Sequence, residues 1–151
     1  MLLAIANSND IADLVSLLSV LFLQEEEFSP DNHAQVRGLS LIIENPAIGH
    51  IIVARENGKL VGMVNLLYTI STALSGKVCI LEDMIVSPEA RCMGVGSEII
   101  KYAISYAQQV GCMRITLLTD NSNIAAQRFY GRFGFEVSAM LPLRLSLRAS
   151  P

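Results

Sequence analysis

The sequence has little of what several common classes of functional site require. Only two histidines, His33 and His50, are present, and neither lies near an acid-rich motif. The three cysteines, Cys79, Cys92 and Cys112, lack the close spacing of metal ligands, and their odd number does not suit a framework of disulfides. We therefore expect neither a metal site nor a Ser-His-Asp triad, and we expect the thiols to be reduced.

Positive charge is also scarce. The eleven Lys and Arg residues are scattered and the net charge is −3, which argues against nucleic-acid binding because no basic cluster is available to neutralise phosphates. No apolar run approaches the eighteen or so residues that cross a bilayer. The most apolar stretch, 14–23, follows Asp10 and Asp13, and no Lys or Arg precedes Arg37, which argues against a signal peptide. We expect a cytoplasmic protein without membrane contact.

The length of 151 residues is that of one domain. Periodicity and turn residues predict an α/β order, in which Asn57-Gly58 is a strong hairpin signal and the almost wholly apolar strand 78–86 is central. The expected strands are 2–6, 51–55, 60–68, 78–86, 112–119, 135–137 and 141–147. The expected helices follow the capping clusters 8–10 and 29–30, and cover 94–110 and 122–133.

The most informative segment is 81–100. It reads as an apolar strand carrying Glu82 and Asp83, then a turn with Gly94 and Gly96, and then the start of a helix. A helix N-terminus offers unpaired N–H groups and partial positive charge, and glycines let an anion approach the backbone. The segment therefore predicts a diphosphate cradle beside an acid.

Two known phosphate-binding motifs do not fit this cradle. A dinucleotide fingerprint needs a small residue where Ile99 stands, and no Lys-Ser or Lys-Thr follows the glycines as a P-loop requires. The spelling Arg91-x-x-Gly94-x-Gly96 instead resembles the acetyl-CoA signature of the GNAT superfamily of N-acetyltransferases. Residues 123–135 resemble the superfamily's other hallmark, Asn-x-x-Ala-x-x-Phe-Tyr-x-x-x-Gly-Phe, at every specified position.

The resemblance implies a single N-acetyltransferase domain over 1–151. Its fold would be GNAT-like α/β, with a mixed, mostly antiparallel central sheet flanked by helices. The two central strands, 78–86 and 112–119, would splay apart to admit the pantetheine arm of acetyl-CoA.

The resemblance also implies how acetyl-CoA is held. The backbone of Ile85 and Val86 would pair with pantetheine, and Asn123 and Tyr130 would line the cofactor from one helix face. Arg91 would either contact phosphate or remain an exposed charge before the helix. The amides that would hold the pyrophosphate are those of Cys92, Met93, Gly94, Val95, Gly96 and Ser97. Cys92 departs from the family pattern, which has Arg, Gly or Lys there, and this puts the cofactor affinity in doubt.

Transfer to an amine requires a base and benefits from an acid. Glu82 and Asp83 are the only acids on the central strand, and neighbours in a strand face opposite sides. By resemblance to small-molecule amine acetyltransferases we favour Glu82 as the base, with Asp83 binding the acceptor or anchoring a loop. Alternatively, both acids only accept hydrogen bonds at a strand end. Tyr130 would protonate the leaving thiolate.

The resulting hypothesis is an acetyl-CoA-dependent N-acetyltransferase that transfers acetyl directly to a primary amine. The alternative is a catalytically silent CoA-binding sensor or partner module of the same fold. The acceptor stays open among a small amine, a polyamine, an aminoglycoside-like antibiotic and a protein or peptide amine. The sequence leaves a homodimer open.

Overall fold

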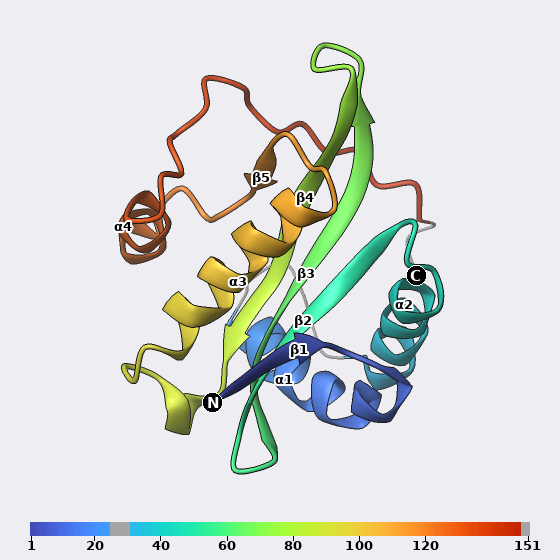
Figure 1. Cartoon of the computed structure of the whole chain (residues 1–151), viewed down its shortest axis with the longest axis vertical. Helices are drawn as coiled ribbons and strands as arrows, with labels where there is room; N and C mark the ends of the chain where they lie inside the picture. Colours follow the sequence, from blue (N-terminus) through green and yellow to red (C-terminus); the bar gives the residue numbers. More distant parts are fainter. Residues whose placement is uncertain (25–30, 149–151) are drawn as a thin grey trace. The chain divides into compact units, whose positions relative to one another are not determined.

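The computed structural model describes residues 1–24 and 31–148. It divides into two compact units, Met1–Leu118 and Thr119–Pro151, both traced in Figure 1. The predicted cap at Ser29-Pro30 lies outside the described residues. So does Glu25-Glu26-Glu27, which the sequence predicts to end the first long helix as an acidic surface turn. The expectation of a single domain over the whole chain stays a prediction.

The first unit is built on a five-stranded sheet with the order β1-β2-β3-β4-β5 (Figure 1). The strands from β1 to β4 pair antiparallel, and β5 is parallel to β4, so the predicted mixed, mostly antiparallel sheet is confirmed. Asn57 and Gly58 both have positive φ, as the predicted two-residue hairpin turn requires. The strands are β1 Leu2–Ile5, β2 Gly49–Glu56, β3 Lys59–Ser71, β4 Gly76–Val86 and β5 Ile115–Leu117.

The helices begin close to where the sequence places them, but their caps differ. The predicted capping cluster Ser8–Asp10 itself forms a 3-10 turn, η1, which Asn7 caps. Asp31 caps α2, its side chain accepting a hydrogen bond from the Ala34 N–H at 3.0 Å. The helices are α1 Ile11–Gln24, α2 Asn32–Glu44, α3 Val95–Gln109 and α4 Ile124–Gly131, with a second 3-10 turn, η2, at Pro88–Ala90.

Helices cover both faces of the sheet (Figure 1). Leu14 of α1 and Leu39 of α2 pack in one buried cluster with Met63 and Ile85 of the sheet. On the other face α3 approaches β3 so closely that a Cβ on Gly62 would come within 2.6 Å of Ile99. Side chains alternate along a strand. Odd-numbered positions of β3 near Met63 therefore face α1 and α2, and even-numbered positions near Gly62 face α3.

A β-bulge interrupts the β3–β4 ladder. Met63 pairs with Ile85 and Asn65 pairs with Glu82, so β4 takes three steps where β3 takes two. The extra residue is accommodated by Asp83, which has the left-handed φ of 53°. This irregularity positions the acids considered below.

Two sequence predictions about the later strands are wrong. The strand expected over 112–119 is only β5, and its pairing with β4 runs from Cys79 with Ile115 to Leu81 with Leu117. Residues 135–137 and 141–147 form no strand in the part of the chain that the structure describes, and Leu143 is 95% exposed. Their alternating apolar pattern satisfies a strand's side-chain period, but a strand also requires a neighbouring chain to complete its hydrogen bonds.

Candidate active site

The two acids of the central strand share one neighbour, Asn65. Asn65 lies opposite Glu82 in the ladder, and its Nδ2 donates a hydrogen bond to Asp83 Oδ2 at 2.8 Å. Glu82 is exposed and Asp83 is half-buried. In a regular strand these acids would face opposite sides, but the left-handed Asp83 breaks that alternation. The bulge therefore brings the Asp83 carboxylate onto the Asn65 amide, next to the exposed Glu82 in the strand.

Asn65 is the residue of this group that the sequence interpretation missed. It is 3% exposed, and no hydrogen-bond donor among the described residues reaches its buried Oδ1. A buried polar atom without a partner costs about 1–3 kcal/mol of stability. The available signal was a lone amide within the otherwise apolar run 60–67.

Beyond the bulge, β4 continues without β5 at its side. Pairing with β5 ends at Leu81, whereas β4 runs to Val86. Ile85 is buried in the core, and the carbonyl of Val86 accepts a hydrogen bond from Arg91 Nε at 3.1 Å. Arg91 thus folds back onto the strand end where the family resemblance predicts pantetheine contacts, and it is exposed before the helix.

The turn into α3 has two left-handed residues. Cys92 has φ 61°, and Gly94, the N-cap of α3, has φ 81°. A Cβ on Gly94 would meet no atom within 4 Å, so the space beside it is open. The Glu98 N–H donates the first helical hydrogen bond, to the Gly94 carbonyl at 3.1 Å. The N–H groups that precede Glu98 belong to the first turn, where a helix offers them no carbonyl partner. This turn has the geometry of an anion cradle.

Cys92 makes the cradle more strained than a glycine would. A side chain at positive φ costs on the order of 1 kcal/mol, which glycine avoids. Cys92, where the sequence departs from the family pattern, therefore occupies a position whose positive φ favours glycine.

The second unit holds Asn123 and Tyr130 on α4. The Asn123 side chain caps the helix, accepting a hydrogen bond from the Ala126 N–H at 3.0 Å. Tyr130 packs edge to face against Phe129 and Phe135, with ring centroids 5.1 and 5.7 Å apart. Burial raises the pKa of Tyr130 to about 12. The phenol therefore holds its proton across the neutral range.

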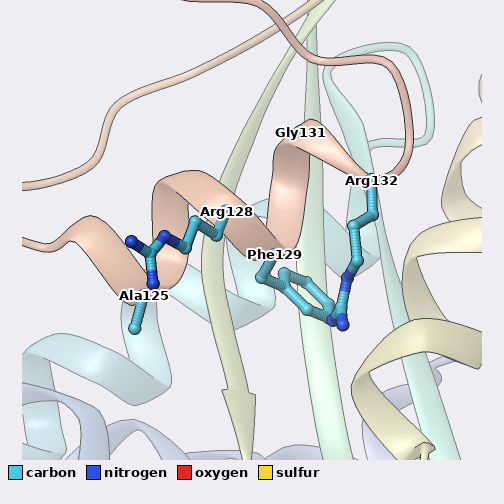
Figure 2. Close-up of a pocket in the computed structure, with 5 residues that line it drawn as sticks. All are labelled: Ala125, Arg128, Phe129, Gly131 and Arg132. Carbon is cyan, nitrogen blue, oxygen red and sulfur yellow. The ribbon is translucent and has the colours of Figure 1, made fainter.

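One face of α4 forms a surface recess with a basic rim. Figure 2 shows the Arg132 side chain beside the Phe129 ring, with its guanidinium carbon 5.5 Å from the ring centroid. Arg128 and Ala125 line the same recess, about one and two turns before Arg132 on the helix (Figure 2). All of them lie within the second hallmark motif, from which Phe129 is predicted to be a core residue; in the structure it is only half-buried.

Two kinds of feature are absent from the described residues. Within 1–24 and 31–148, His, Cys, Asp and Glu form no group of three or more suited to a metal ion. No helix in those ranges has the length and apolar character needed to cross a bilayer.

Known proteins match both the sequence and the fold. The model of the acetyltransferase (GNAT) family matches residues 13–135. YhfO, an uncharacterized N-acetyltransferase of Bacillus subtilis (strain 168), is 36% identical over 86 residues, which are 57% of this chain and 58% of that protein. The chain thus spans less than two thirds of the length of that relative.

Two further matches cover more of the chain. The aminoalkylphosphonate N-acetyltransferase of Salmonella typhimurium is 26% identical over 133 residues, which are 88% of this chain and 83% of that protein. A crystal structure of a predicted acetyltransferase with acetyl-CoA from Clostridium acetobutylicum superposes with a TM-score of 0.79 at 18% identity. That superposition covers 97% of this chain and 96% of the other.

Proposed function

Because the chain belongs to the acetyltransferase (GNAT) family, we propose that it transfers an acetyl group from acetyl-CoA directly to a primary amine. The observation that carries this proposal is the continuous segment from the bulge to the N-terminus of α3. It begins with two acids. It continues through the end of β4, which pairs with β3 but not with β5, and it reaches the left-handed Gly94. An acid for the amine and a cradle for a diphosphate would thereby lie on one stretch of chain.

The residues of the cradle fit the diphosphate of CoA. The open space beside Gly94 admits an anion, and the amides from Cys92 to Ser97 supply donors at a helix N-terminus. Arg91 adds a guanidinium next to this turn, and the backbone of Ile85 and Val86 would pair with pantetheine amides. The likeness of residues 123–135 to the second family hallmark assigns Asn123 and Tyr130 to cofactor contacts, and this assignment stays a prediction. Bound acetyl-CoA supplies an activated thioester carbonyl.

A carboxylate at the bulge would solve the proton problem of the acceptor. An alkylammonium with a pKa of about 10.4 is almost fully protonated at pH 7, and releasing its lone pair costs roughly 4–5 kcal/mol. Glu82, exposed at the bulge, would take that proton directly or through water, while Asp83 binds the cation. Two acidic residues in succession on β4 would also attract a cationic acceptor.

The acceptor class is proposed from charge alone, and four chemistries fit it: small amines, polyamines, aminoglycosides and peptide lysines. The aminoalkylphosphonate acetyltransferase that the chain resembles adds aminophosphonates to this set. The rival function, a silent CoA-binding module, would retain the cradle and lack turnover.

The experiment is a thiol-release assay with acetyl-CoA and a panel of amines. The panel contains 2-aminoethylphosphonate, spermidine, an aminoglycoside and a lysine peptide, and mass spectrometry identifies the acetylated product. We expect at least one amine to be acetylated. Glu82→Gln should lower kcat/KM at neutral pH, with a deficit that shrinks towards pH 10 because more of the amine is then already deprotonated.

Glu56→Gln is the matched control, since Glu56 lies at the far end of β2 beside the hairpin turn. It should leave the rates unchanged. Tight acetyl-CoA binding without acetylation of any panel amine would favour the silent module. A basic pH dependence that disappears in Asp83→Asn and persists in Glu82→Gln would exchange the roles of the two acids.

A further inference from the structure

We infer that Asn65 is a positioning residue for the acceptor site, holding the Asp83 carboxylate where a cationic amine binds. The inference rests on the proposed function, in which Asp83 contacts the acceptor. It assigns the recognition of the amine to three residues of two strands, Asn65 on β3 with Glu82 and Asp83 on β4.

The orientation of the Asn65 amide is fixed by its partner. An ionised carboxylate can only accept hydrogen bonds, so the Nδ2 group, not Oδ1, must face Asp83 Oδ2 across the 2.8 Å contact. This leaves Oδ1 pointing elsewhere in the interior, where no donor among the described residues reaches it. The Asn65 amide thus donates to Asp83 while its own Oδ1 lacks a hydrogen bond.

The surroundings of Asn65 favour an apolar residue. Its neighbours Met63, Val64 and Leu66 on β3 are all fully buried, and Asn65 itself is 3% exposed. An apolar side chain here would avoid the unpaired oxygen, and the half-buried Asp83 could then be hydrated instead. A residue that lowers stability at a buried position is expected where function requires it.

The bulge explains why Asp83 requires such a partner. With φ 53°, Asp83 adopts a backbone conformation that aspartate populates uncommonly, and its side chain leaves the regular alternation of β4. A hydrogen bond from the rigid, buried Asn65 limits the rotamers of that carboxylate. The carboxylate is then held in place before the acceptor arrives.

The test combines stability with kinetics in Asn65→Val, with Asn65→Ala as a second variant in case valine does not fit. We expect thermal unfolding at a temperature equal to or above that of the wild type. With the panel amine that the wild type acetylates fastest, we expect the acceptor KM to rise about tenfold while kcat changes little. In an Asp83→Asn background, the same substitutions should leave KM unchanged, because Asn65 acts through that carboxylate.

Val64→Ala is the matched control. Val64 is the fully buried neighbour on the α3 face, so its truncation should lower the unfolding temperature and leave the acceptor KM as it is. The inference is overturned if Asn65→Val and Asn65→Ala lower stability as Val64→Ala does and leave KM unchanged. It is also overturned if the rise in KM persists without the Asp83 carboxylate.

Failure of the proposed function gives a different result. If the wild type acetylates no amine of the panel, the function is overturned and the inference falls with it. If the wild type is active and Asn65→Val acetylates its amine with wild-type KM, the function stands and only the role of Asn65 is rejected.

Discussion

The ring of Tyr130 packs against the rings of Phe129 and Phe135. With an ordinary phenol pKa of about 10, proton transfer to a thiolate of pKa about 8.5 is uphill by roughly 2 kcal/mol. Burial between aromatic rings raises the pKa of Tyr130 to about 12, which makes the same transfer uphill by roughly 5 kcal/mol. A hydrogen bond to the leaving sulfur is therefore better supported than complete proton transfer.

Tyr130→Phe should consequently have a modest effect. We expect near-normal acetyl-CoA affinity and a single-turnover rate reduced about tenfold, below the usual range for acid–base groups. Because the raised pKa keeps the phenol protonated up to about pH 12, the wild-type rate should show no decline from Tyr130 between pH 8.5 and 10.5. Tyr102→Phe on α3 is the control. A wild-type rate for Tyr130→Phe would make the tyrosine a packing residue.

Asn65 shows what a single sequence hides at the scale of residues. Glu82, Asp83 and Tyr130 could be nominated from motifs, because acids before a glycine turn and the Asn-to-Phe hallmark are local patterns. The partner of Asp83 lies on another strand, at a position that depends on the register of a bulge. A one-residue error in register would place a different β3 side chain opposite the acids.

At the scale of elements, the turn before α3 depends on backbone rather than on side chains. Gly94→Val should abolish acetyl-CoA binding, measured by calorimetry, while the protein remains folded. A valine at φ 81° either shifts the backbone out of the cradle or fills the open space beside it.

Gly58→Val is a matched control for this substitution. Gly58 has a φ of 79° and similar open space, but it lies in the β2–β3 hairpin turn. Both variants should lose comparable stability, and only Gly94→Val should lose affinity. An unchanged acetyl-CoA affinity in folded Gly94→Val would reject the phosphate cradle.

Elements were predictable where the signal was local. The family resemblance and the mostly antiparallel sheet are confirmed, and the Asn57-Gly58 turn has the positive φ values that its spelling indicates. The ends of β5 and the strands expected over 135–147 were not predictable, because a ladder partner is a tertiary contact. The alternating leucines of 141–147 indicate which side chains would share a face of a strand. They do not specify which other segment would hydrogen-bond to the backbone of that strand.

At the scale of the molecule, one histidine should make stability depend on pH. His50 Nδ1 lies 2.7 Å from the Tyr68 hydroxyl, and its ring packs edge to face on Tyr106. Burial lowers the pKa of His50 below its ordinary value of 6.5, and the charge of Lys77 lowers it further. The folded protein therefore favours the neutral ring.

The free energy of unfolding should fall as the pH drops below 6.5. Below pH 6.5, His50 binds a proton in the unfolded chain but not in the folded protein. Stability is therefore lost until the pH falls below the lowered pKa of folded His50. The slope for one proton is at most about 1.4 kcal/mol per pH unit. Urea unfolding of His50→Gln between pH 7 and 5 should show a flatter dependence. His33→Gln, at an exposed position on α2, should not, and equal slopes for both variants would contradict the assignment.

The proposed acceptor site depends on one extra residue in β4. Between the pairs Met63–Ile85 and Asn65–Glu82, β4 has one residue more than a regular ladder needs. A related chain with one residue fewer there could keep both pairs, both faces and the whole sheet. It would nevertheless lack the turn that presents Asp83. In an alignment, a one-residue gap at this point would thus distinguish chains that keep the fold alone from chains that also keep the proposed acceptor site.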